Sequence, residues 1–205
     1  KSQALLMNDT TTNKDTTSTV VNWKLVLERI DLNRVAFAMQ MPDDSLRLST
    51  YIDKAGLTDG MVDLGSARYS AARFLLSGSS LGYDGNNSDP TPGFDPAHIA
   101  LSDVNIRIDS LLYGGRDIGA RIKEFSANDR SGLTLSSLTG DISSDSTTIQ
   151  VPGLLLKTPY SELRLLATVP WSSFDNTPSG TLRSLLTASV GKEDVFIFAG
   201  TLPDE

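Results

Sequence analysis

The sequence predicts an all-β fold that is mostly antiparallel, contains little helix and is built from two diverged β repeats. Short segments with alternating apolar and polar residues are separated by turn residues, and several of these segments share one unusual spacing. The spacing recurs in the same order in two halves of the chain. Short, similar strands favour an antiparallel meander over alternating strands and helices. A β-solenoid is the nearest alternative.

The shared spacing is clearest at Ile149, Val151, Leu154 and Leu156, which occupy the first, third, sixth and eighth positions of an extended segment. Because side chains alternate between the faces of a strand, the three-residue step keeps these residues on one face only if one extra residue bulges out. Pro152-Gly153 suits a bulge, since proline lacks an N–H for the ladder and glycine tolerates the geometry. We therefore expect a bulge there, with Val151 and Leu154 on the same face.

The spacing recurs at Leu25, Leu27, Ile30 and Leu32, at Tyr69, Ala71, Phe74 and Leu76, at Ile99, Leu101, Val104 and Ile106, and begins again at Leu133, Leu135 and Leu138. With 39% apolar residues, chance alone produces a few matches, so their order is the stronger evidence. Each half has the spacing once early and once late. This order predicts two diverged copies of one β unit.

The chain divides into four parts. Residues 1–19 are a flexible segment or the edge of a fragment, because Asn8 to Thr19 contains no apolar residue. Lys1 in place of an initiating methionine indicates an internal segment of a longer protein. Residues 20–81 form the first repeat and residues 98–205 the second. Residues 82–97, with three prolines and three glycines, form a connecting loop or a hinge.

Within the first repeat we expect two strands between residues 21 and 41, a third near 46–51, and two more at 56–64 and 68–77. In the second repeat, the expected strands are 99–101, 104–108, 118–125, 133–142, 147–156 and 162–169. Gly114 to Asp117 reads as a hairpin turn before Ile118. The C-terminal part is expected to hold a strand up to Val190, followed by Lys192 to Ala199 as a short helix or a final strand.

Composition excludes some functions. The net charge of -7 and the pI near 4.7 argue against a nucleic-acid partner, because phosphates need a basic surface. The chain has no cysteine, so it holds neither a disulfide nor a thiolate metal site. No apolar run approaches the roughly 18 residues that a membrane span requires.

The sequence predicts a non-enzymatic protein without a cofactor or a metal. His98 is the single histidine, and we expect an ordinary surface or half-buried residue in preference to a general base. No Walker loop, GxSxG elbow or GxGxxG motif is present. Asp84, Asn86, Ser88 and Asp89 are spaced loosely like a calcium loop, but that loop lacks its sixth-position glycine and its final glutamate. A solvated connector fits them better.

One polar pattern, Asp followed by Ser or Thr and then by Thr or Leu, resembles the O-glycosylation sequon of envelope proteins in some Gram-negative bacteria. Accidental matches are expected in a chain rich in Ser, Thr and Asp. The candidate acceptor residues are Thr10, Thr16, Ser45, Ser110 and Ser146.

The chain resembles the TamB and AsmA-like family of large envelope proteins. The resemblance rests on Gly93 to Ile99, on Asp103 to Ile106, and above all on the stretches from Asp145 to Thr147, from Leu154 to Ser161 and from Val169 to Trp171. It is best between Phe94 and Trp171 and fainter from Trp23 to Leu81. These motifs are patterns of strands and turns, not active-site residues.

The resemblance implies an elongated curved sheet, a β-taco-like trough with an apolar floor. Such proteins are anchored in the inner membrane of Gram-negative bacteria, reach across the periplasm and serve outer-membrane biogenesis, through phospholipid transport or assembly of outer-membrane proteins. The implied partners are phospholipid acyl chains, neighbouring segments of the same protein and a TamA-like outer-membrane protein. The expected groove residues are Leu25, Leu27, Ile30, Leu32, Phe74, Leu76, Ile99, Leu101, Val104, Ile106, Leu133, Leu135, Ile149, Val151, Leu154 and Leu156.

Two alternatives stay open at this point. The same apolar residues could fill the closed core of a β-sandwich, and the function could be that of an extracellular or periplasmic adhesion or glycan-binding module. A carrier leaves its apolar face open or filled with lipid, whereas a sandwich leaves no void. An adhesin should carry aromatic residues on exposed loops.

Overall fold

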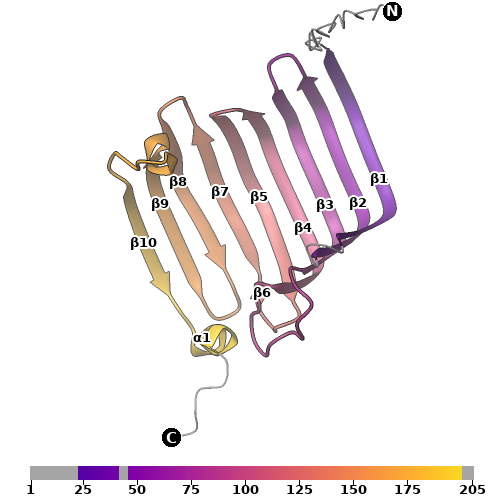
Figure 1. The fold of residues 1–205 in the computed structure, drawn as a ribbon, viewed down its shortest axis with the longest axis vertical. Coiled ribbons are helices and arrows are strands. Elements are labelled where there is room, and N and C mark those ends of the chain that lie inside the picture. The colour runs from indigo at the N-terminus through magenta and orange to yellow at the C-terminus, as the bar shows by residue number, and fades with distance from the viewer. Residues whose placement is uncertain (1–22, 42–45, 200–205) are drawn as a thin grey trace, which may run out of the picture.

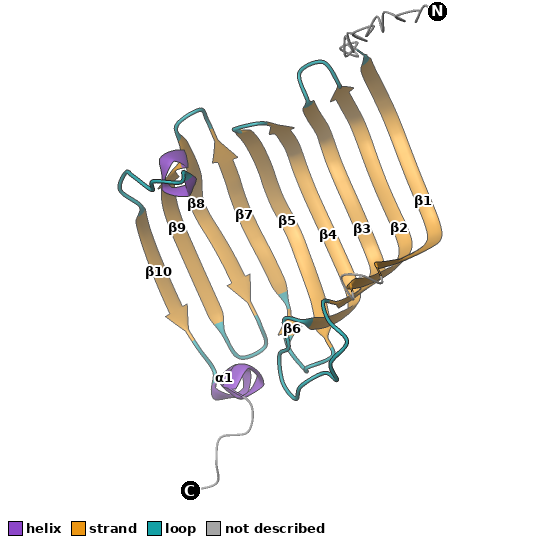
Figure 2. Ribbon diagram, in the orientation of Figure 1, coloured by secondary structure: helices purple, strands orange, loops and turns teal. Residues whose placement is uncertain are grey.

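The computed structural model describes residues 23–41 and 46–199 and shows them as one antiparallel sheet with ten strands (Figure 1). The strands are β1 (Lys24–Met41), β2 (Leu46–Asp63), β3 (Arg68–Asp84), β4 (His98–Gly114), β5 (Asp117–Asp129), β6 (Thr134–Leu135), β7 (Ser137–Ser144), β8 (Thr148–Lys157), β9 (Glu162–Pro170) and β10 (Arg183–Ser189). The two helical segments are the 3-10 turn η1 (Trp171–Phe174) and the α-helix α1 (Lys192–Ala199), drawn in purple in Figure 2.

The strand order follows the sequence, except that β6 lies off the path and pairs with β5. The prediction of an all-β, mostly antiparallel, curved sheet with little helix is confirmed, and the sheet is open. In the described ranges, no second sheet packs on the first, so the closed sandwich is not formed by these residues. The expected turn between Gly114 and Asp117 and the C-terminal helix are also present.

Strands β1, β2 and β4 are longer than the sequence predicts. β1 is one strand of 18 residues where two strands were expected, and β2 also has 18 residues. β4 joins the expected strands 99–101 and 104–108 into one element. The physical reason is that the three-residue steps interrupt the alternation of side chains locally but not the backbone ladder.

A first break line crosses the sheet at the steps predicted in β1 and β3. It consists of Glu28, Asp59, Ala72 and Ser110, which face one another across β1 to β4 and are skipped by the pairing. Asp59 and Ser110 adopt left-handed φ angles of 50° and 57°. Such angles reverse the alternation of side chains in a strand.

The step across the first break line keeps the apolar residues on one face. A Cβ built on Gly60 would lie 2.6 Å from the Cδ2 atom of Leu57, so positions 57 and 60 face the same side although they are three residues apart. Leu27 pairs with Gly60 and Ile30 pairs with Leu57. Leu27 and Ile30 therefore also share a face, as their spacing predicts.

A second break line runs through Arg34, Gly78 and Asp103, whose φ angles are 54°, 59° and 50°. Leu101 of β4 pairs with Leu81 of β3, and Val104 pairs with Ser79. The step is three residues long in β4 and two residues long in β3, so β4 contains one extra residue. This bulge confirms the predicted step at Asp103. Figure 1 shows that β1 to β3 turn sharply near their lower ends.

The bends divide β1 to β4 into a long arm and a short arm. The side chains of Ser79 and Val104, which are only 2% and 5% exposed, lie at the second break line. Ala71 is 4% exposed and lies beside the first break line. These buried residues therefore lie at the bends on the side of the sheet that carries Leu101.

The bulge predicted in β8 is present. Val151 pairs with Ala167 and Leu154 pairs with Leu165, so three residues of β8 oppose two of β9. Ala167 and Leu165 share a face of β9 because they are two residues apart. Val151 and Leu154 therefore share that face too, which confirms the predicted role of Pro152-Gly153.

The division into two repeats stays a prediction. Leu25 and Ile99 are both the second residue of the first strand in their half. Phe74, however, lies in the third strand of its half, whereas Leu154 lies in β8, the fourth strand along the sheet from β4. A duplication would therefore need a strand gained or lost. The halves are not separate sheets, since β3 pairs with β4 along most of its length.

Candidate functional site

An apolar row crosses the sheet from edge to edge. Each member pairs directly with the next, so all of them lie on one face, here called the apolar face. The row consists of Ile30, Leu57, Phe74, Ile108, Ile122, Gly140, Leu154, Leu165 and Leu186.

The neighbouring row on the opposite side, here called the charged face, carries ions of alternating sign. Arg73, Asp109, Arg121 and Asp141 pair in turn across β3, β4, β5 and β7. The Nε atom of Arg73 lies 3.3 Å from Oδ1 of Asp109, and the Nε atom of Arg121 lies 3.0 Å from Oδ1 of Asp141. Opposite charges on facing strands stabilise their pairing, so this face satisfies its own polar groups.

The predicted groove residues all fall on the apolar side. β1 carries Leu25, Leu27, Ile30 and Leu32, β3 carries Phe74 and Leu76, β4 carries Ile99, Leu101, Val104 and Ile106, Leu133 precedes Leu135 of β6, and β8 carries Ile149, Val151, Leu154 and Leu156. Residues missed by the sequence analysis include Leu57, Ile108, Ile122, Leu163 and Leu165. Leu163 and Leu165 could have been identified from the sequence, because they alternate regularly with Ala167 and Val169 in β9.

Much of the apolar face is uncovered. Leu25, Ile30 and Leu32 are 43%, 38% and 41% exposed. Among the described residues, the hydrophobic side chains that are fully buried are those of Ala71, Val104 and Ala127. Contiguous exposed apolar surface of this kind marks an interaction site.

Helix α1 covers one end of the apolar face. Thr158 and Ser161, in the turn between β8 and β9, both donate hydroxyl hydrogen bonds to Oδ2 of Asp194. Asp194 is 5% exposed and Ser161 is 8% exposed. The backbone N–H of Gly191 donates to Ser161 Oγ at 3.0 Å, so the start of the helix is fixed to the β8–β9 turn.

The other end of α1 is held by the loop that follows β3. The N–H of Phe94 donates to the carbonyl of Ile197 at 2.8 Å, and the rings of Phe94 and Phe198 lie 5.3 Å apart. Figure 1 shows α1 between the end of β10 and this loop. The loop after β3 thereby holds the C-terminal end of α1.

A cavity of about 580 Å³, here called the α1 pocket, lies between the helix and the sheet. Leu133, Leu135, Leu156 and Leu163 line its sheet side, and Val195 and Phe198 line its helix side. Leu133, Leu135 and Leu156 were predicted as groove residues. The sequence does not show that these three residues meet in one pocket, because Leu156 lies about twenty residues after the other two.

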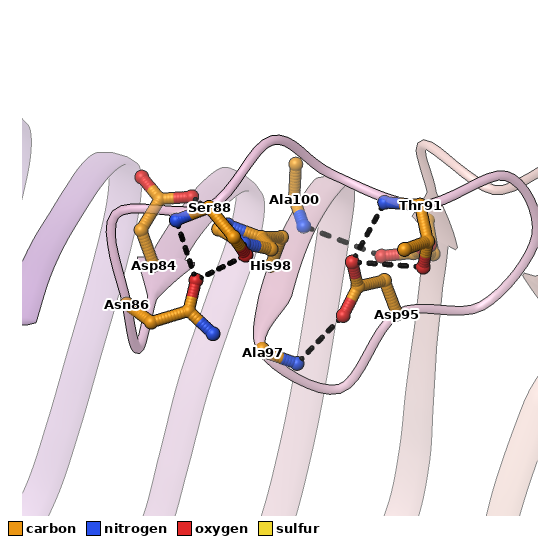
Figure 3. Close-up of polar contacts among 9 residues, drawn as sticks. Asp84, Asn86, Ser88, Thr91, Asp95, Ala97, His98 and Ala100 are labelled. Atoms are coloured by element: carbon orange, nitrogen blue, oxygen red, sulfur yellow. Dashed lines mark hydrogen bonds and ion pairs between the residues drawn. The ribbon is translucent and has the colours of Figure 1, made fainter.

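His98 is the centre of a polar cluster at the start of the loop after β3 (Figure 3). Its ring is 3% exposed, which corrects the expectation of a surface or half-buried residue. Nδ1 lies 2.9 Å from Oδ1 of Asp84, and Nε2 lies 3.2 Å from Oγ of Ser88. Ser88 Oγ donates to Oδ1 of Asn86 at 2.6 Å.

The order Asp84, His98, Ser88 has the outline of a catalytic triad, but the hydrogen bonds differ. An amide oxygen only accepts, so the Ser88 hydroxyl hydrogen points to Asn86 and not to His98. A serine nucleophile must give its proton to the histidine. The cluster therefore anchors the loop to the ends of β3 and β4.

Asp95 fixes the second part of the same loop (Figure 3). Its carboxylate accepts from the N–H and the hydroxyl of Thr91, at 2.9 and 3.0 Å, and from the N–H of Ala97 at 3.0 Å. The hydrogen bond from the Thr91 N–H, together with the others, lowers the pKa of Asp95 below its ordinary value. Asp95 is 8% exposed.

Two of the predicted glycosylation acceptors, Ser110 and Ser146, are exposed. Ser110 lies within β4 at the first break line, and Ser146 lies in the turn between β7 and β8. In that turn, hydrogen bonds from the hydroxyl and the N–H of Thr147 lower the pKa of Asp145. Thr10, Thr16 and Ser45 lie outside the described residues.

Across residues 23–41 and 46–199, no cluster of acidic, histidine or cysteine side chains is arranged to hold a metal ion. Within the same ranges, no helix has the length and hydropathy needed to cross a membrane. Comparisons with family models, with curated proteins and with solved structures found no match to this chain.

Proposed function

We propose that this chain is a non-enzymatic segment of a TamB/AsmA-like protein that carries phospholipid acyl chains on its apolar face. In this proposal the parent protein is anchored in the inner membrane of a Gram-negative bacterium and serves outer-membrane biogenesis from the periplasm. A TamA-like outer-membrane protein is a further proposed partner, and assistance in outer-membrane protein assembly is the related role.

The observation that supports the proposal most is the continuity of the apolar row from Ile30 to Leu186 on a face that the described residues leave open. A closed domain would cover this row with a second layer. Hydrocarbon chains can cover it without any specific hydrogen bond, because the row offers apolar side chains alone apart from Gly140.

The sheet edges support the proposed contact with neighbouring segments. In the described ranges, β1 pairs only with β2 and β10 pairs only with β9, so both leave backbone groups that another strand can bind. A sheet continued at both edges would extend the apolar face into a longer trough.

The test compares two adjacent residues of β3. Phe74 lies on the apolar row, whereas Leu75 pairs with Gly56 and Arg107 on the charged side. Phe74→Asp should stay folded, since the open face leaves the new carboxylate hydrated, but should lose phospholipid that co-purifies with the protein. Leu75→Asp is the matched control and should keep the lipid.

Circular dichroism and mass spectrometry of extracted lipids measure these outcomes. Unfolding of Phe74→Asp, together with no phospholipid in the wild-type protein, would show that a protein layer covers this face instead. Equal lipid loss in both variants would mean that the lipid binds without preference for a face.

A second candidate is the adhesion or glycan-binding module. It is supported by Tyr160 and Phe174, which are 57% and 66% exposed in the segments after β8 and β9. Aromatic rings at such positions can stack on sugars. Binding to a glycan array that Tyr160→Ala abolishes, with no lipid in the wild-type protein, would favour this alternative.

A further inference from the structure

We infer that the α1 pocket is a binding subsite for the methyl end of a single acyl chain. This inference rests on the proposed function and adds a defined position where a chain stops. The open part of the apolar face offers a surface, whereas the pocket offers walls on two sides.

The pocket is continuous with the apolar face. Leu156 and Leu163 pair with each other in β8 and β9 and line the pocket. They lie two residues from Leu154 and Leu165, which belong to the apolar row. A hydrocarbon chain that lies along the row can therefore pass into the pocket without crossing a polar strip.

The lining favours hydrocarbon over a polar or charged group. The polar residues at the pocket are Thr158, Ser161 and Asp194, together with backbone. Their hydroxyls are committed to the Asp194 carboxylate. Among the described residues, no lysine, arginine or histidine lines the pocket, so they offer a phosphate head group no cation to pair with there. The head group must stay outside.

The volume and the stiffness of the pocket fit this role. About 580 Å³ lies within the usual range of roughly 300–1,000 Å³ for small-molecule sites. The helix wall is fixed at both ends, by Asp194 on the β8–β9 turn and by Ile197 on Phe94. A wall held in this way sets the depth to which a chain can enter.

The test uses the complete 205-residue chain and vesicles of palmitoyl-oleoyl phosphatidylethanolamine and phosphatidylglycerol. A photoreactive phenylalanine analogue replaces Phe198, which lines the pocket, or Phe196, which does not. Phe198 and Phe196 lie on the same helix and are 60% and 46% exposed, so the two positions differ in their contact with the pocket and not in being exposed. A third position, Phe74, reports on the open apolar face. Labelled lipid is measured by mass spectrometry after irradiation.

The inference predicts lipid adducts at Phe198 and Phe74 and few at Phe196. Adducts at Phe74 without adducts at Phe198 would overturn the subsite and leave the proposed function standing. Absence of adducts at both would overturn both. Equal labelling of Phe196 and Phe198 would show that lipid contacts α1 from outside, and this too overturns the subsite.

A filling variant gives a second readout. Leu163→Trp narrows the pocket and should displace about two methylene groups, which lowers labelling affinity at Phe198 by roughly 15-fold. Labelling at Phe74 should not change. If Leu163→Trp leaves labelling at Phe198 unchanged, the pocket does not hold a chain end.

Discussion

Arg73 and Phe74 follow one another in β3, yet they belong to two surfaces that depend on different partners. Arg73 lies opposite Asp109 and forms an ion pair with it, as the alternating ladder across the charged face requires. Phe74 pairs with Leu57 and Ile108 and has no second layer above it within the described residues. The ion-paired row of the charged face thus completes its interactions within the sheet. The apolar row does not, so it needs a partner.

The largest expected effect comes from deleting Gly153. The deletion removes the extra residue of the β8 bulge and turns Leu154 and Leu156 toward the charged face. We expect a loss of about 3 kcal/mol or more in the free energy of unfolding, because every later side chain of the strand changes sides. Chemical denaturation measures this loss.

Gly153→Ala is the control for that deletion. A Cβ at Gly153 would meet no atom within 4 Å, so the substitution should change stability by less than about 1 kcal/mol. If the deletion were as mild as this substitution, the bulge would not determine which face the leucines occupy.

The second effect concerns Gly140, the member of the apolar row that has no side chain. Gly140 has a φ angle of 148°, and a Cβ there would collide with the carbonyl oxygen of Gly153 in the facing strand. Gly140→Ala should cost about 1–3 kcal/mol. Gly115 also has a positive φ angle, 63°, but a Cβ there would meet no atom within 4 Å. Gly115→Ala therefore introduces backbone strain without a collision, and it should lower stability less than Gly140→Ala. Equal losses in thermal denaturation would show that β7 and β8 can separate without cost.

The third effect compares the two faces directly. Arg121→Gln removes one member of the exposed charge ladder and should lower stability by about 0.2–1 kcal/mol, with a smaller loss at high salt. Lipid binding should not change. Ile122→Gln, one residue further along β5, should weaken lipid binding. Lipid loss in Arg121→Gln that matches the loss in Ile122→Gln would contradict the division of roles between the faces.

The smallest effect depends on pH. The folded-state pKa of Asp95 is depressed, so its carboxylate stabilises the loop fully above its unfolded pKa of about 3.9 and loses this contribution as the pH falls through the folded value. The melting temperature of the wild type should therefore exceed that of Asp95→Asn at pH 6, and the difference should shrink toward pH 3. Asp89→Asn, in the same loop, is the control. A difference that grows on acidification would reverse the sign of this argument.

The sequence predicts the face of each residue better than the length of each strand. A step from Leu27 to Ile30 fixes which residues share a face, because side-chain alternation is a local property. The same step resembles the end of a strand, so β1 was expected as two elements. Backbone pairing across β2 decides that it is one.

The α1 pocket lay beyond the reach of the sequence. Asp194 and Thr158 are far apart in the chain, and their contact depends on the position of β10 and on the turn between β8 and β9. The His98 cluster was missed for a similar reason. Asp84 and Ser88 were recognised only as parts of a poor calcium loop, whereas β3 and β4 bring them to the histidine.

Photo-crosslinking at Phe74 and at Leu75 tests the central claim most directly, because these neighbouring residues of β3 lie on opposite faces. A photoreactive amino acid is placed at one position or the other, the chain is irradiated in phospholipid vesicles, and the adducts are identified by mass spectrometry. The account predicts phospholipid adducts at position 74 and few or none at position 75. Equal labelling at both positions, or labelling at position 75 alone, would contradict it.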